Sequence, residues 1–177
     1  MREPNKKETH KYLGKHRGTV INNIDPEQRG RIQAIVPDVF GLTPSSWALP
    51  CLPIAGKQMG VHLVPQITAK VWIEFEQGNP DHPIWTGCFW GVVAEVPALA
   101  KAGNPASPSI ILQTGLQNTF MLSDTPGPTG GILLKTTGLA FISVNDSTGI
   151  TISDGKGGMI NLFNGIVTIN QGALLIK

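Results

Sequence analysis

Two closely spaced carboxylates are the first residues in this sequence that could perform chemistry. Glu74 and Glu76 stand two residues apart in "KVWIEFEQ", and Asp81 follows in the turn "GNPDHP". A pair of carboxyl groups can act as general acid and as nucleophile or base, so one interpretation is a cell-wall glycan hydrolase. Residues two apart on a strand also share a face, and a solvated strand face is the simpler interpretation of the glutamates. The hydrolase is therefore kept as an alternative.

Thiol and metal chemistry have weak support. Cys51 and Cys88 lie in apolar stretches, "ALPCLPIAG" and "WTGCFWG", without the C-x-x-C spacing of a metal site, so we expect buried, reduced thiols. The histidines stand at four scattered positions: His10, His16, His62 and His82. No two of them have zinc-site spacing, and the sequence contains no G-x-S-x-G nucleophile motif. We predict no catalytic residue, no metal and no cofactor.

Aromatic residues raise a second alternative, which is base stacking on single-stranded nucleic acid. The tryptophans are Trp47, Trp72, Trp85 and Trp90. The formal net charge of +2 over 177 residues is too small to favour a polyanionic partner. Trp72 and Trp85 also stand beside apolar runs, which favours core or subunit contacts. We therefore expect no nucleic-acid partner.

The N-terminal residues are locally basic. We interpret residues 1–13 as a solvated basic arm or docking tail. Residues 1–17 lack the apolar core of a secretory signal, and no run approaches the roughly twenty apolar residues of a membrane span. We expect assembly in the cytoplasm.

Composition divides the chain into two modules. Most of the lysines and arginines and all the tryptophans precede residue 104, and no proline follows Pro128. The segment "PALAKAGNPASPS" is rich in proline, alanine and serine, which is typical of a linker or an extended crossover. We predict a first domain over residues 14–96, a linker over 97–109 and a second domain over 110–177.

The sequence of the first module predicts short strands and no helix of ten or more residues. The runs "KHRGTVINNID" and "GRIQAIVPDVF" are expected to be neighbouring strands joined by the turn "DPEQRG". A hairpin is expected after them, with Val71, Ile73 and Phe75 on one face of its first strand and a turn at "GNPDHP". About five strands in ninety residues fit a small OB-type barrel, so the fold class is all-β.

These residues carry a family resemblance. The series "GKHRGTVINNIDPEQRGRIQAIVPDV", "WALPCLPIAG" and "KVWIEFEQGNPDHPIWTGCFWG" resembles the barrel domain of phage baseplate assembly protein V and the related valine-glycine repeat spike proteins. The match runs from Gly14 to Gly91. The resemblance implies a homotrimeric spike at the centre of a contractile-tail baseplate, with the barrel beneath a hub and a C-terminal triple-stranded β-helix.

The second module alternates apolar and small polar residues in runs of about five, as in "GITISDGKGGMINLFNGIVTIN". One chain alone would leave an apolar ribbon with open strand edges, so the missing partner is expected to be another copy. We expect an intertwined trimeric β-helix in which each exposed strand edge pairs with a neighbouring chain. The expected trimer core is Ile142, Val144, Ile150, Ile152, Ile160, Leu162, Val167 and Ile169. Thr151, Ser153, Asn161 and Thr168 are expected to face outward.

The sequence ends in "GALLIK", an apolar terminus formed by Leu174, Leu175 and Ile176. The metal-binding His-x-His tip of some family members is missing, since no histidine follows His82. We expect a small conical tip protein to contact these residues, because an apolar end is costly to leave in water. The alternatives are a metal cap or an end sealed by the three copies themselves.

Together these observations predict a structural, non-enzymatic central spike that joins the baseplate hub and pierces the target envelope. Its expected partners are two further copies, a hub protein on the barrel side and the tip protein, with transient contact to the target membrane. It would be a component of a phage tail or an injection particle. The alternatives of a single-stranded nucleic-acid binder and a glycan hydrolase stay open at this point.

Overall fold

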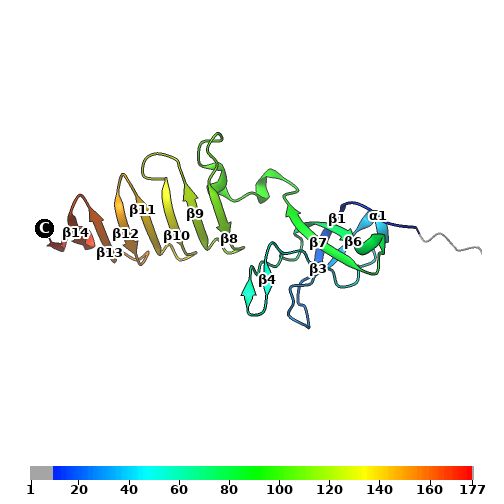
Figure 1. The fold of residues 1–177 in the computed structure, drawn as a ribbon. Helices are drawn as coiled ribbons and strands as arrows, with labels where there is room; N and C mark the ends of the chain where they lie inside the picture. Colours follow the sequence, from blue (N-terminus) through cyan, green and yellow to red (C-terminus); the bar gives the residue numbers. More distant parts are fainter. Residues whose placement is uncertain (1–9, 177) are drawn as a thin grey trace, which may run out of the picture. The chain divides into compact units, whose positions relative to one another are not determined.

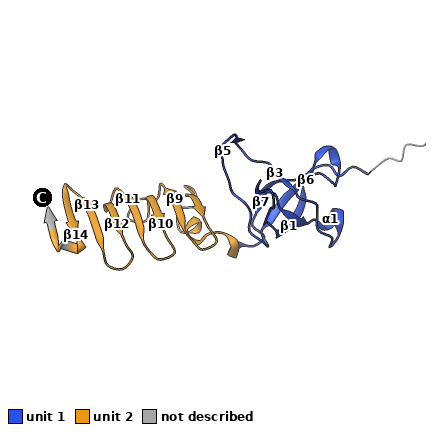
Figure 2. Cartoon of the chain, turned by 90° about the horizontal axis from the view of Figure 1, so that it is seen from below, with its two compact units in different colours: residues 1–93 blue, residues 94–177 orange. Residues whose placement is uncertain are grey.

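The computed structural model describes residues 10–176, and for Leu175 and Ile176 it describes the backbone alone. The chain divides into two compact units, residues 1–93 and 94–177 (Figure 2). The expected basic arm over residues 1–13 lies mostly outside the described residues. No helix among residues 10–176 is long and apolar enough to cross a membrane.

The first unit is a five-stranded OB-like half-barrel, so the predicted fold is confirmed (Figure 1). Its sheet has the strand order β2-β1-β6-β7-β3, and a bridge between Ile32 and Ala48 links the segments that precede β2 and β3. A separate pair, β4 and β5, lies outside this sheet. The strands are β1 (His16–Asn22), β2 (Gln33–Ile35), β3 (Leu49–Pro50), β4 (Ala55–Gly56), β5 (Met59–Gly60), β6 (Lys70–Phe75) and β7 (Pro83–Phe89).

Alternation along the strands builds the core of this unit. Val71, Ile73 and Phe75 share the buried face of β6, and β6 pairs with β7 as the predicted antiparallel hairpin. The core consists of Val20, Ile32, Ala34, Val36, Ala48, Val71, Ile73, Phe75 and Trp85. The run "GRIQAIVPDVF" forms a strand only as far as Ile35, because proline at the first helical position starts the one-turn helix α1 (Pro37–Phe40).

The second unit is an eight-stranded antiparallel sheet in which each strand pairs with its neighbours in sequence, from β8 to β15. Figure 1 shows the strands lying side by side in chain order. Their bounds are β8 (Ile110–Gln113), β9 (Thr119–Ser123), β10 (Gly131–Lys135), β11 (Phe141–Asn145), β12 (Gly149–Ser153), β13 (Met159–Phe163), β14 (Ile166–Ile169) and β15 (Leu174–Ile176). Three 3-10 turns accompany them: η2 (Val93–Glu95), η3 (Ala98–Lys101) and η4 (Asn170–Gly172).

The segment predicted as a linker, residues 97–109, contains η3 and lies in the second unit, where η3 contacts β8. The exact domain boundaries stay a prediction. The two units differ sharply in their interiors: Met121 is the single fully buried hydrophobic residue of the described part of the second unit. Eight strands therefore fold into a sheet that has almost no core of its own.

Candidate assembly interface

One face of the C-terminal sheet is apolar along its whole length. Strand register places Ile142 opposite Ile152, Ile152 opposite Ile160, and Ile160 opposite Ile169, so these residues form one cross-strand row. A second row beside it contains the other half of the predicted trimer core: Val144, Ile150, Leu162 and Val167. We call these two rows the apolar face.

The apolar face is open to solvent in the single chain. Six of the predicted core residues are between 39% and 44% exposed: Ile142, Val144, Ile150, Ile152, Ile160 and Leu162. Val167 and Ile169 are half-buried. A continuous exposed apolar surface of this kind marks a protein contact. The structure thus brings all eight residues onto one face, and their contact across the trimer stays a prediction.

The apolar face continues beyond the eight predicted residues, into the first three strands of the sheet. Register continues the two rows through β8, β9 and β10, adding Ile110, Leu112, Phe120, Leu122, Ile132 and Leu134. The segments "SIILQ", "NTFMLS" and "GILLK" contain the apolar residues of this extension. Apolar residues also stand on the other face of these strands. Leu133 and Met121 pair across strands on the reverse face, which hid the period-two pattern.

Thr151 lies on the reverse face of the sheet but is not exposed there. Its side chain is buried, and its hydroxyl accepts a hydrogen bond of 2.9 Å from the Asn161 amide, which also donates to the Thr148 carbonyl. Ser153, Asn161 and Thr168 are half-buried on the same face. Thr151 thus lies on the face opposite the apolar rows, and neighbouring polar groups of the chain cover it there.

The backbone groups at most strand edges of this sheet are hydrogen-bonded within the single chain. In the single chain, each strand from β9 to β14 pairs along both edges with strands of the same chain. Only β8 and β15 have a free edge in the described sheet. The pairing of these two edges with a neighbouring chain stays a prediction.

Two glycines permit the tight hairpins of this sheet. Gly131 and Gly149 open β10 and β12 with φ of 84° and 74°, a region that favours glycine. A Cβ atom on Gly131 would stand 2.0 Å from the Val144 carbonyl oxygen, and one on Gly149 would stand 2.0 Å from that of Leu162. The backbone could not approach so closely with any side chain at these positions.

The predicted tip residues lie on the last strand. β15 pairs with β14, with Leu174 opposite Ile169, and Leu174 is 51% exposed. The side chains of Leu175 and Ile176 lie outside the described residues. Their contact with a tip protein stays a prediction.

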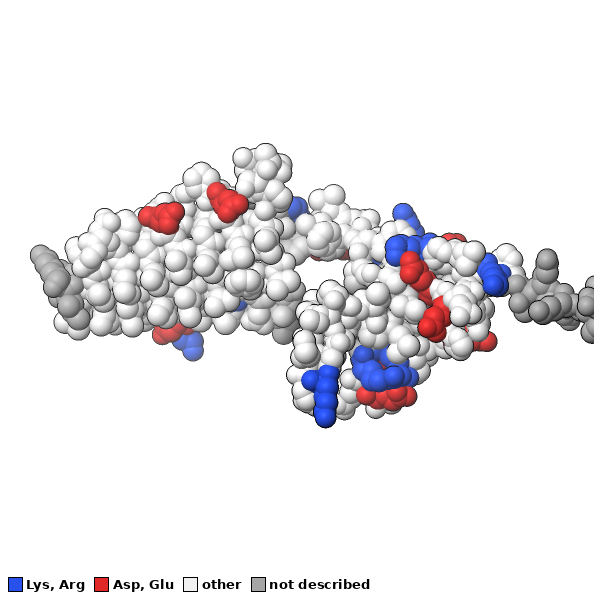
Figure 3. Space-filling model, viewed as in Figure 1, with Lys and Arg blue, Asp and Glu red and all other residues white. Residues whose placement is uncertain are grey.

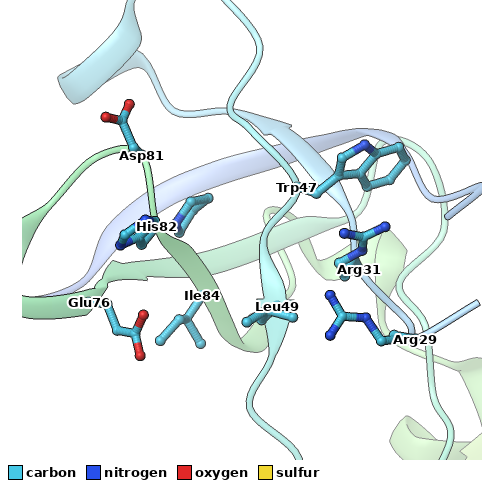
Figure 4. Close-up of a pocket in the computed structure, with 9 residues that line it drawn as sticks. Arg29, Arg31, Trp47, Leu49, Glu76, Asp81, His82 and Ile84 are labelled. Carbon is cyan, nitrogen blue, oxygen red and sulfur yellow. The ribbon is translucent and has the colours of Figure 1, made fainter. Parts of the chain in front are cut away.

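The carboxylates that suggested a hydrolase do not form one cluster. Glu74 is ion-paired with Lys15 at 2.6 Å on β6, whereas Glu76 lies past the strand end in the 3-10 turn η1 (Glu76–Gly78). Glu76 and Asp81 line a small open pocket of the barrel together with His82 (Figure 4). Both carboxylates are exposed. Burial is what raises the pKa of a general acid, so this arrangement offers no support for acid catalysis.

The tryptophans do not form a stacking platform. Trp85 is buried and donates a hydrogen bond of 3.1 Å to the Gly30 carbonyl, and Trp72 packs against Phe89 beneath the Arg17 guanidinium. Trp47 lies under Arg31 on another part of the barrel. These side chains point to separate environments, which does not favour binding of successive bases.

Both cysteines are exposed and form no disulfide within the chain, so the expected burial is wrong. Cys51 directly follows β3, and Cys88 lies on β7 outside the core. Among residues 10–176, no group of three potential ligands could hold a metal ion.

Comparison with known families places this geometry in context. Residues 16–90 are similar to the family described as the type VI secretion system/phage-baseplate injector OB domain. Residues 109–175 are similar to the phage baseplate V C-terminal trimerisation domain. No curated protein matches the chain. The two matches follow the order of the two units, and the second covers the sheet that bears the apolar face.

Proposed function

This chain belongs to the phage baseplate V family, and on that premise we propose that three copies form the central spike of a contractile-tail or injection-system baseplate. The family membership confirms the resemblance found in the sequence. It makes the chain a baseplate spike or injector protein, a component of a phage baseplate or a type VI secretion system. The stoichiometry, the neighbours and the piercing role are the proposal.

The observation that carries the proposal is a sheet without a core. The described residues of the second unit include one buried hydrophobic residue, while the apolar face stays about two-fifths exposed over the four consecutive strands β10 to β13. Burial of apolar surface is the main favourable term in folding, so this sheet needs a partner with a matching face. The trimerisation domain supports two further copies as that partner.

The mechanism that we propose is transmission of force by a stiff β-structure. Interior strands are hydrogen-bonded along both edges, and packing of the three apolar faces would add a dry interior. Few charges accompany the C-terminal unit on the face drawn in Figure 3. Low charge suits a narrow trimer, because three copies of any charged residue would lie near one axis and repel one another.

The proposal assigns neighbours to the two ends. A hub protein binds on the barrel side, and a small conical tip protein binds at the C-terminal end beside Leu174. The assembled trimer pierces the target envelope and makes transient contact with the membrane. The family is a structural baseplate family, and we assign this chain no enzymatic step of its own. Assembly takes place in the cytoplasm before incorporation into the particle.

Native mass spectrometry of the full chain tests the proposal. We expect three times 18.9 kDa, with no folded monomer on dilution, because the C-terminal sheet needs its partners to bury the apolar face. A folded monomer that persists at micromolar concentration would overturn the proposal.

A further inference from the structure

An apolar arm leaves the barrel between β3 and β6. All residues from 53 to 63 are exposed, and four are large hydrophobics: Ile54, Met59, Val61 and Leu63. We call residues 53–63 the arm. Figure 2 shows the pair β4–β5, which forms most of the arm, projecting from the rest of the first unit.

The two ends of the arm are anchored, whereas its middle is not. Leu52 and Val64 are partly buried against the barrel core, and the Asn23 amide donates a hydrogen bond of 2.9 Å to the Pro65 carbonyl. Between these anchors the arm is a hairpin of two-residue strands. An isolated two-stranded hairpin is at best marginally stable in water, and exposed apolar side chains add a further cost. The arm therefore exposes apolar side chains that no surface of its own barrel covers.

The barrel carries a pocket with complementary chemistry, which we call the Leu49 pocket. Leu49 and Ile84 lie between two charged sides, with Glu76 and Asp81 on one side and Arg31 on the other (Figure 4). Arg31 is already paired with Asp25 and Glu27. Within residues 10–176, neither Glu76 nor Asp81 takes part in an ion pair. The acidic side thus has unused charge beside an apolar floor.

The arm matches both features of this pocket. Its hydrophobic side chains fit the apolar floor, and Lys57, at the turn between β4 and β5, is its one lysine or arginine. Because the arm is exposed in the single chain, the pocket of the same chain does not hold it. A contact from one copy to the next closes into a ring under threefold symmetry, so each arm would find one pocket.

We infer that the arm of each copy docks into the Leu49 pocket of the neighbouring copy, with Lys57 facing Glu76 and Asp81. This inference rests on the trimer of the proposed function. It assigns the barrel a second, heterologous interface that is separate from the apolar face of the C-terminal sheet. The arms would fasten the three barrels to one another.

Cross-linking between two differently tagged chains tests this inference. One chain carries Met59→Cys and the other carries Asp81→Cys, both in a Cys51→Ser, Cys88→Ser background, and the two are co-expressed and mildly oxidised. We expect a disulfide-linked two-chain species on a non-reducing gel. A chain with Leu42→Cys in place of Asp81→Cys is the matched control, because Leu42 is exposed but does not line the pocket.

Charge reversal sharpens the test. Lys57→Glu in the arm chain should lower the cross-linking yield about fivefold, the effect of losing one exposed ion pair. Glu76→Lys in the pocket chain should restore it. Equal cross-linking to the Leu42→Cys control, or no linked species from a trimer of the expected mass, would overturn the inference and leave the proposed function intact. A monomer in native mass spectrometry would instead overturn the proposed function.

Discussion

The carboxylate of Asp25 accepts two hydrogen bonds from the guanidinium of Arg31, 3.0 Å from Nε and 2.6 Å from Nη2. The same carboxylate accepts backbone N–H groups of Glu27, Arg29 and Arg31, so it closes the whole turn between β1 and β2. The Arg31 guanidinium, followed by these N–H groups, holds the pKa of Asp25 well below its usual range, although burial opposes the shift.

Acid should weaken the barrel through this carboxylate. A folded-state pKa below the unfolded value means that the stabilisation is present above about pH 4 and is lost as the pH falls through the folded pKa. Asp25→Asn should therefore lower the melting temperature at pH 7 and have a much smaller effect at pH 2. Thermal unfolding of both proteins across this range is the measurement, and a pH-independent difference would contradict the role of the charge.

A charge on the apolar face should prevent assembly. Ile160→Asp would place three carboxylates in the trimer interior, at a cost of several kcal/mol per chain even after their pKa values rise. We expect trimer yield to fall at least tenfold in native mass spectrometry. Thr168→Asp is the matched control, because Thr168 is half-buried on the reverse face. Similar yields from the two variants would show that the apolar face is not the interface.

The hairpin glycines should differ in their tolerance of a methyl group. Gly149→Ala forces a Cβ atom against the Leu162 carbonyl, whereas Gly165, at a φ of 75°, has open space around the added carbon. Gly165→Ala should cost about 1–2 kcal/mol of backbone strain per chain, and Gly149→Ala should cost clearly more. Melting temperatures of the two trimers provide the comparison, with equal losses counting against the backbone clash.

Removal of the last strand should separate folding from tip binding. Deleting residues 173–177 takes away β15 but leaves seven strands from β8 to β14, so we expect the trimer to persist. Pull-down of a tip protein encoded with the same system should be lost with the truncated trimer. Undiminished binding would move the tip contact away from Leu174.

Sequence patterns predicted the strands that alternate apolar and polar residues. They missed the features that depend on contacts between residues far apart in the chain or on very short strands. The alternation of Ile150 and Ile152 around Thr151 identified the strand and its apolar side. Burial of Thr151 was hidden because it depends on Asn161, a partner in the next strand. The arm has no periodic signal, since its strands are two residues long. Pairing within the chain was equally invisible, because alternation specifies faces and not which chain supplies the adjoining edge.

Pairing of each strand with its neighbour in sequence makes the length of the C-terminal sheet adjustable. Inserting or deleting one hairpin would change the sheet by about 9.5 Å, twice the spacing between strands, and would leave every other strand in register. An even number of added strands also preserves the direction of the chain. Evolution can therefore tune how far such a sheet reaches by duplicating a segment of about twenty residues, without redesigning the barrel to which it is joined.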